Sequence, residues 1–212
     1  IDLIKKLYPN TVRIAFVTDN SYEGAALGTL MREVIVEKYP ELNLASLRGL
    51  SFSMSQIRVR MRHLPENSVV LLGTWRVDKN GRYYQESSIK EIFPEDFNLP
   101  VFTMTGVGLG EWAVGGYIPQ KEWDVEHIVE DLHRYNMGEK TESLFKFTES
   151  KYVFSKEKLQ EYGLSEDKLP NGTEIVSEVD EEVQRYQKYL GIAITLTVVF
   201  LVMTMTIFML LQ

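Results

Sequence analysis

Polar side chains directly follow an apolar run near the start of the sequence, where an α/β protein carries its binding or catalytic groups. The run VRIAFVT (residues 12–18) predicts a strand that is buried on both faces. Four polar residues come straight after it: Asp19, Asn20, Ser21 and Tyr22. A helical pattern begins behind them, so they are expected at the carboxyl end of a parallel strand, where α/β sheets bind their ligands.

Hydrogen-bonding and stacking groups also follow two later runs that predict strands, residues 68–73 and VFTMT (101–105). The candidate ligand contacts at these two ends are Thr74, Trp75, Arg76, Thr105 and Gly106. A small number of polar groups beside aromatic surface is what a small-molecule site needs. The nine candidates together therefore predict a binding site for a polar small molecule.

Several candidates also have a purely structural explanation. Asp19, Asn20 or Ser21 can cap the helix that follows, because a side-chain oxygen at that position accepts from the orphan N–H groups of the first turn. Trp75 either packs against a neighbouring loop or offers a stacking platform to a ligand. The sequence leaves these alternatives open.

The sequence lacks the motifs of phosphate, nucleophilic and metal chemistry. No G-x-x-x-x-G-K-[ST] string occurs, and the loop GVGLG (106–110) precedes a predicted strand instead of opening a helix. The string TDNSYEG (18–24) lacks the first glycine of a nucleophile elbow. There is no cysteine, and His127 and His133 are six residues apart on one predicted helix, a rotation of about 240° that leaves their directions about 120° apart, so they are not expected to face one metal ion. We therefore expect no catalytic residues, no metal and no cofactor.

Strand and helix patterns alternate along the first part of the sequence. Apolar residues at helical spacing between 27 and 35 predict one helix, and Ser53 can cap a second that runs to about His63. A third helix is predicted from about Glu122 to Asn136. This alternation predicts an α/β fold with a mainly parallel sheet of about five strands and flanking helices.

Composition divides the sequence into three segments. Residues 1–138 predict the α/β lobe, and residues 139–188, rich in Lys, Glu, Ser and Thr, predict a membrane-proximal connector. Residues 189–212 carry no charge and would form a helix of about 36 Å, enough to cross a hydrocarbon core of about 30 Å. The sequence starts without methionine and stops at this predicted transmembrane helix, so we expect part of a longer protein. The net charge of −7 excludes nucleic acid as a partner.

Three stretches carry a resemblance to a known family: YPNTVRIAFVTDNSYEGAA (8–26), LPENSVVLLGTWRVDKNGRYY (64–84) and LPVFTMTGVGLGEWAVGGYIP (99–119). They resemble the second lobe of type 1 periplasmic-binding-protein-like sensor domains, which look like ABC-transporter substrate-binding proteins fused to bacterial membrane histidine kinases. The tail, from YVFSKEKLQEYG (152–163) to YQKYLGIAI (186–194), is similar to the segment that joins such a sensor to its membrane helix.

The resemblance implies the ligand-sensing portion of a two-component histidine kinase, anchored in the bacterial inner membrane with its soluble part periplasmic or extracellular. It implies a ligand cleft between two lobes, with the nine candidates on one wall and the first lobe absent from this sequence. No kinase sequence is present, so the chain itself is expected to be non-catalytic. Where the family usually has a YEQG-like helix start, this sequence reads QKEWDVEHI (120–128).

The implied partners are a small-molecule ligand, for example a sugar-like solute, or a periplasmic partner protein. The membrane is a further implied partner, as is a second copy in a homodimer of the full-length receptor. The alternative function is a membrane-anchored substrate-binding component of an ABC-type transporter.

Overall fold

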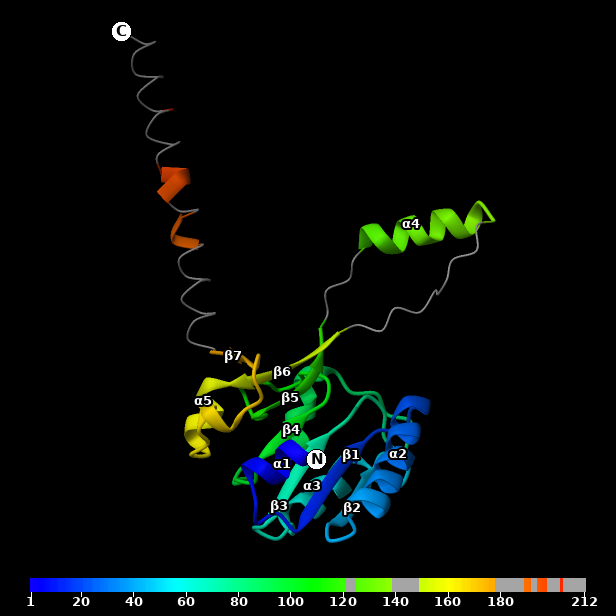
Figure 1. The fold of residues 1–212 in the computed structure, drawn as a ribbon, viewed down its shortest axis with the longest axis vertical. Coiled ribbons are helices and arrows are strands. Elements are labelled where there is room, and N and C mark those ends of the chain that lie inside the picture. The colour runs from blue at the N-terminus through cyan, green and yellow to red at the C-terminus, as the bar shows by residue number, and fades with distance from the viewer. Residues whose placement is uncertain (121–124, 139–148, 178–188, 192–193, 198–202, 204–212) are drawn as a thin grey trace. The chain divides into compact units, whose positions relative to one another are not determined.

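Seven strands form one sheet in the order β2-β1-β3-β4-β5-β6-β7 (Figure 1). The first five strands in this order are parallel to their neighbours, and β6 runs antiparallel to β5. The strands are β1 (Arg13–Thr18), β2 (Asn43–Arg48), β3 (Ser68–Leu72), β4 (Val101–Thr103), β5 (Gly115–Pro119), β6 (Ser150–Ser155) and β7 (Glu174–Val176).

The computed structural model describes residues 1–120, 125–138, 149–177, 189–191, 194–197 and 203. The chain divides into two units, Ile1–Ile175 and Val176–Gln212. The first unit is the α/β lobe, and it carries all of the sites discussed below.

Helices alternate with the parallel strands, as the spacing of apolar residues predicts. The α-helices are α1 (Asp2–Leu7), α2 (Tyr22–Lys38), α3 (Met54–Arg62), α4 (Val125–Asn136) and α5 (Lys156–Glu161), and the 3₁₀ helices are η1 (Glu86–Ile92) and η2 (Glu166–Lys168). The predicted cap of α3 is confirmed, because Ser53 and Gln56 form a reciprocal capping box. Gly138 follows α4 with φ +78°, the left-handed conformation expected just after a helix.

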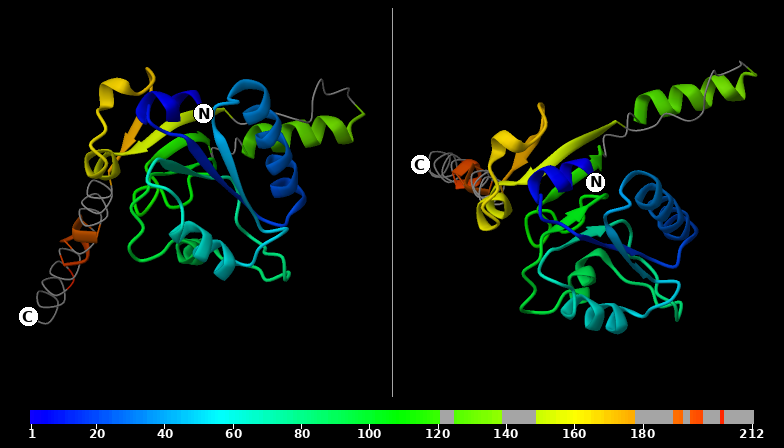
Figure 2. Two further views of the ribbon diagram at one scale, coloured as in Figure 1. Left: turned by 90° about the horizontal axis from the view of Figure 1, so that it is seen from below. Right: turned by 60° about the horizontal axis from the view of Figure 1, so that its bottom comes forward.

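The lobe has three layers, with one apolar core on each face of the sheet. On one face α1, α2 and α5 cover a core that includes Phe16, Phe102 and Phe154. On the other face α3 and η1 cover a core that includes Ile57 and Trp75. Figure 2 (left) shows α1 and α2 on one side of the sheet and α3 on the other.

The predicted α/β class with a mainly parallel sheet is confirmed, and the sheet is larger than the five strands expected. The two additional strands, β6 and β7, lie in the stretch 139–188 that the sequence assigned to the connector. Five residue pairs join β5 to β6, from Gly115↔Phe154 to Pro119↔Ser150. The lobe therefore extends beyond the predicted boundary at residue 138.

Among the residues that the structure describes, no helix is long and apolar enough to cross a membrane. Most of the predicted transmembrane segment 189–212 lies outside the described residues, as do residues 178–188 of the predicted connector.

Candidate functional site

Asp19 is buried at the carboxyl end of the sheet, which is the side where the parallel strands finish, and its carboxylate is occupied by the protein itself. The side chain is 1% exposed. Oδ1 accepts hydrogen bonds from the backbone N–H of Ser21 at 3.0 Å and from the Ser21 hydroxyl at 2.5 Å. Oδ2 accepts from the backbone N–H of Arg76 at 2.8 Å. The carboxylate thus ties the loop after β1 to the loop after β3.

The backbone around Asp19 is packed too closely to admit a larger residue. A Cβ on Gly24 would lie 2.2 Å from Asp19 Oδ1, and a Cβ on Gly49 would lie 2.8 Å from the Asn20 nitrogen. The Asn20 N–H also donates to the carbonyl of Val77 at 2.8 Å. Three chain segments therefore fix the loop after β1.

Ser21 is the residue that caps α2, since its hydroxyl accepts from the backbone N–H of Gly24 at 3.0 Å. This settles the capping alternative among the three candidates in favour of Ser21. The neighbouring Tyr22 is the first residue of α2 and is 94% exposed. The side chains of Asn20 and Tyr22 make no hydrogen bond with any described residue, so both are available to a ligand.

Trp75 lies in the core between the sheet and α3. It is 1% exposed, and its ring centroid lies 6.1 Å from that of Tyr84. Of the two alternatives for Trp75, the structure therefore shows the packed one, and neither face of its ring is exposed at the surface. The side chain of Arg76 is exposed, while its backbone N–H is held by Asp19.

Thr105 and Gly106 are half-buried at the carboxyl end of β4. The Thr105 N–H donates to Thr103 Oγ1 at 3.3 Å, and Gly106 has φ +82°, a conformation that favours glycine. In the glycine loop that follows, a Cβ on Gly108 would lie 2.0 Å from the Trp112 ring. The structure explains this loop as a tight turn packed under an aromatic side chain.

The structure brings only part of the predicted site together by direct contact. Asp19, Ser21 and Arg76 share hydrogen bonds, whereas Trp75, which precedes Arg76 in the sequence, is buried in the core. No hydrogen bond between described residues links Thr105 or Gly106 to this group.

Buried polar atoms without a partner lie at the same end of the sheet, and no sequence pattern predicts them. Thr18 Oγ1, Thr74 Oγ1 and Trp75 Nε1 are buried without a hydrogen-bond partner among the described residues. Thr18 is the last residue of β1, while Thr74 and Trp75 follow β3. Such atoms are rare in native interiors and indicate water or a ligand group that completes the bonding.

A second buried carboxylate, Asp78, organises the hairpin formed by residues 76–84. The Asn80 and Arg82 N–H groups donate to Asp78 Oδ1 at 2.9 and 3.2 Å, and Tyr84 Oη donates to Oδ2 at 2.9 Å. Burial by itself raises the pKa of Asp78, but these hydrogen bonds and one from the Met54 N–H lower it below its ordinary value. Asn80 and Gly81 form the turn of this hairpin, with Gly81 at φ +72°.

The hairpin and the start of α3 enclose a cavity of about 310 Å³. Its lining contains Arg58, Arg82 and Glu91 together with the hydroxyl groups of two serines. These are Ser53 and Ser55, whose Oγ atoms lie 3.0 Å apart. The cavity is a polar hollow at the carboxyl end of the sheet on the α3 face.

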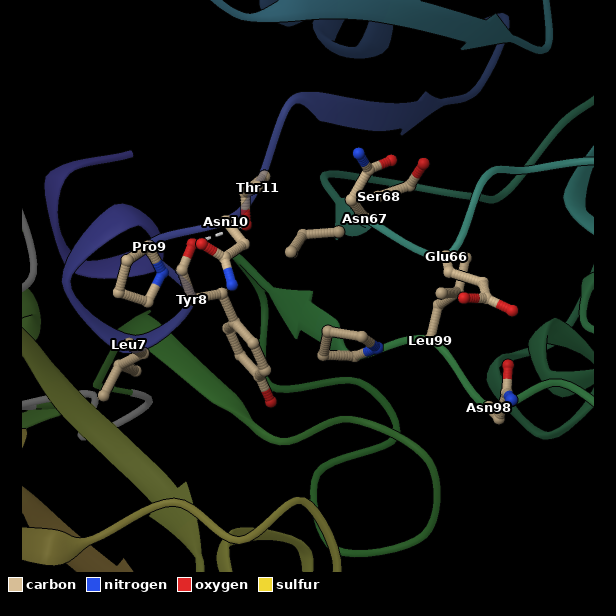
Figure 3. A pocket seen from close by; sticks show the side chains of 12 residues that line it. Leu7, Tyr8, Pro9, Asn10, Thr11, Glu66, Asn67, Ser68, Asn98 and Leu99 are labelled. Carbon is tan, nitrogen blue, oxygen red and sulfur yellow. Dashed lines mark hydrogen bonds between the residues drawn. The ribbon is translucent and has the colours of Figure 1, made fainter.

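Another cavity, of about 430 Å³, lies at the opposite end of the sheet, where β1, β3 and β4 begin (Figure 3). Asparagines of the three preceding loops line it: Asn10, Asn67 and Asn98. Burial raises the pKa of the Tyr8 phenol in its wall, and the Tyr8 hydroxyl and Ser68 Oγ are buried without a partner among the described residues. The sequence did not predict this cavity.

Within the described part of the chain, no group of three or more His, Cys, Asp or Glu side chains could hold a metal ion. His127 and His133 both lie on α4, as predicted. The predicted helix start at residues 120–123 lies largely outside the described residues.

No family profile and no curated protein matches the chain. Three solved structures share its fold. A conserved domain protein from Vibrio cholerae is 16% identical with a TM-score of 0.57, and the match covers 82% of this chain and 58% of that one. A ligand-free, open substrate-binding protein with adhesive properties from Clostridium difficile is 12% identical with a TM-score of 0.55, covering 83% of this chain and 58% of that one.

The third structure is an ABC domain in complex with L-Trp from Streptococcus pneumoniae. It is 13% identical with a TM-score of 0.56, and the match covers 82% of this chain and 60% of that one. The chain thus spans less than two thirds of each of these proteins. The likeness shows a periplasmic-binding-protein-like fold, shared with substrate-binding proteins.

Proposed function

We propose that this chain is the ligand-binding second lobe of an extracytoplasmic sensory receptor, which signals through a membrane helix to a histidine kinase elsewhere in the protein. In this proposal the chain binds a small molecule and catalyses no reaction. The fold shared with a substrate-binding protein and with an ABC domain in complex with L-Trp supports the ligand-binding part of the proposal. The kinase connection rests on the resemblance of the sequence to such sensors.

The observation that carries the proposal is the unused bonding capacity at the carboxyl end of the sheet. Thr74 Oγ1 has no partner among the described residues, and the side chains of Asn20 and Tyr22 make no hydrogen bond with any of them. Ligands of parallel α/β sheets bind at this end. We assign the buried Asp19 a bracing role in this proposal, because three protein donors already bond to its carboxylate.

The exposed apolar side of α4 supports the presence of the first lobe elsewhere in the protein. Val129, Leu132 and Tyr135 are 59%, 51% and 58% exposed, and their spacing places them within about 120° of one another around the helix. Apolar faces of this kind are normally covered in a soluble protein. We propose that a first lobe covers this side of α4. The matched structures are longer than this chain, and their additional length is enough for such a lobe.

The alternative function, a membrane-anchored substrate-binding component of an ABC-type transporter, is supported by the same structural likeness. In that case ligand binding would feed transport instead of a kinase. The two functions predict different consequences of the same binding event, namely ligand-dependent phosphorylation or ligand uptake.

Titration calorimetry of the full-length natural protein tests the binding proposal, with L-tryptophan and glucose as probes. We expect saturable binding of one probe, weakened about tenfold by Asn20→Ala and by Thr74→Val, since each removes a hydrogen bond to the ligand. Asn98→Ala, at the opposite end of the sheet, is the matched control and should leave the affinity unchanged. Equal effects of Asn20→Ala and Asn98→Ala would remove the carboxyl end from the site. Phosphorylation and uptake, measured with the same probe, then separate the two functions.

A further inference from the structure

Positive charge is concentrated in one part of an otherwise acidic chain. Residues 43–84 contain seven Arg and Lys residues and two Asp and Glu residues, whereas the whole chain contains 23 and 30. One of the two acids, Asp78, is buried, and its carboxylate is occupied by donors of the protein. Residues 43–84 therefore contribute mainly positive charge to the surface. Six of these cations lie on α3 and the 76–84 hairpin, which we call the basic surface: Arg58, Arg60, Arg62, Arg76, Lys79 and Arg82.

The two elements of the basic surface are joined by their backbones. The Lys79 N–H approaches the Phe52 carbonyl at 3.5 Å, and the Met54 N–H donates to the Asp78 carboxylate. Arg58 from α3 and Arg82 from the hairpin line the same cavity of about 310 Å³. The fold therefore brings together two guanidinium groups from positions 24 residues apart in the sequence.

Neither guanidinium is neutralised by a strong ion pair among the described residues. Arg58 lies 3.9 Å from Glu95, whose side chain is 99% exposed, so this pair is worth little. Arg82 lies over the Tyr84 ring, 5.3 Å from its centroid, and makes no salt bridge with a described residue. Glu91 is the acidic group of the lining that remains exposed to solvent. The cavity lining thus contains two cations, two serine hydroxyls and two carboxylates, of which that of Glu91 is open and that of Asp78 already accepts hydrogen bonds from the protein.

We propose that the cavity between α3 and the 76–84 hairpin binds a small anion that carries a carboxylate or phosphate group, with Arg58 and Arg82 as its cationic contacts. Guanidinium groups bind such oxyanions through paired N–H donors, and whichever of the Ser53 and Ser55 hydroxyls accepts the hydrogen bond between them can donate a further bond. The surrounding basic surface raises the local concentration of anions. This site goes beyond the proposed cleft, because it lies within this lobe and needs no residue of the first lobe.

Calorimetric titration of the 212-residue chain in detergent micelles at fixed ionic strength tests the proposal. The probes are inorganic phosphate and succinate, and vesicles containing phosphatidylglycerol form a third arm that separates a lipid headgroup from a free anion. We expect saturable binding of phosphate or succinate that Arg58→Gln and Arg82→Gln each weaken about tenfold. Glu91→Gln should strengthen binding, because it removes the negative charge that faces the anion.

Arg62→Gln is the matched control. It removes the same charge from the same helix, one turn from Arg58, but Arg62 is exposed and does not line the cavity. Its affinity should change less than twofold. Circular dichroism of each variant checks the fold, and Arg82→Lys, which keeps the charge, should bind more tightly than Arg82→Gln. Equal loss in Arg58→Gln and Arg62→Gln, binding to vesicles alone, or no saturable binding by the wild-type chain would each overturn the proposal.

Discussion

The substitution Asp19→Asn distinguishes a structural carboxylate from a ligand contact. The change keeps the shape of the side chain but replaces one acceptor oxygen by an NH₂ group. In the structure both oxygens accept bonds, from Ser21 at 3.0 and 2.5 Å and from the Arg76 N–H at 2.8 Å. In either orientation the new amide therefore sets a donor against a donor, at a side chain that is 1% exposed.

The cost follows from these contacts. One charge-assisted hydrogen bond is lost and one buried N–H or O–H group is left without an acceptor, which together lower the free energy of unfolding by about 2–4 kcal/mol. Urea denaturation followed by circular dichroism measures this change. Asp96→Asn, an exposed aspartate, should alter stability by less than about 0.5 kcal/mol and serves as the control.

Ligand affinity supplies the second half of this test. If Asp19 only holds the two loops together, Asp19→Asn should lower the apparent ligand affinity only as far as it lowers the fraction of folded protein. A variant that is as stable as the wild type but no longer binds ligand would refute the structural interpretation. It would return Asp19 to the list of ligand contacts.

Two further predictions concern close packing and pH. Gly24→Ala should destabilise the lobe by more than about 2 kcal/mol, because its Cβ would lie 2.2 Å from Asp19 Oδ1, and Gly28→Ala should cost less, because its Cβ meets the flexible Arg48 side chain at 3.1 Å. Both changes gain the same helix propensity, so similar urea midpoints would contradict the packing argument. The pKa of Asp78 is lowered in the folded state, so its stabilising contribution is complete above about pH 4 and is lost as the pH falls through the folded-state pKa. Asp78→Asn should therefore flatten the acid limb of the stability–pH curve, and an unchanged limb would show that its hydrogen bonds do not matter.

The alternation of apolar runs and helical patterns was enough to predict the α/β class. The spacing of apolar residues differs between helices and buried strands, because it reflects which sides of each element face a core. It was not enough to predict β6. The sequence of β6, SKYVFS, follows a long polar stretch, and its partner β5 lies more than 30 residues earlier, so only long-range pairing selects the strand.

In the candidate site, too, roles set by local sequence were predictable and roles set by long-range contacts were not. The capping role of Ser21 is local and was among the predicted alternatives. The occupation of Asp19 depends on the Arg76 N–H, 57 residues away, and no local pattern carries that information. The position of Trp75 was equally undetermined, because an aromatic residue after a strand can turn inward or outward. Its burial follows from the space left between the sheet and α3.

The antiparallel pairing of β5 with β6 has a consequence for how this lobe could be rebuilt. The Gln120 N–H donates to the Glu149 carbonyl at 2.8 Å, so the chain leaves the sheet and returns to it at one point. This hydrogen bond holds the two ends of the intervening segment together, and the closure entropy of a connecting segment grows only slowly with its length. The position is therefore a natural graft point. A short turn could replace residues 121–148 to give a minimal lobe, and a foreign domain whose termini lie close together could be inserted there as a reporter.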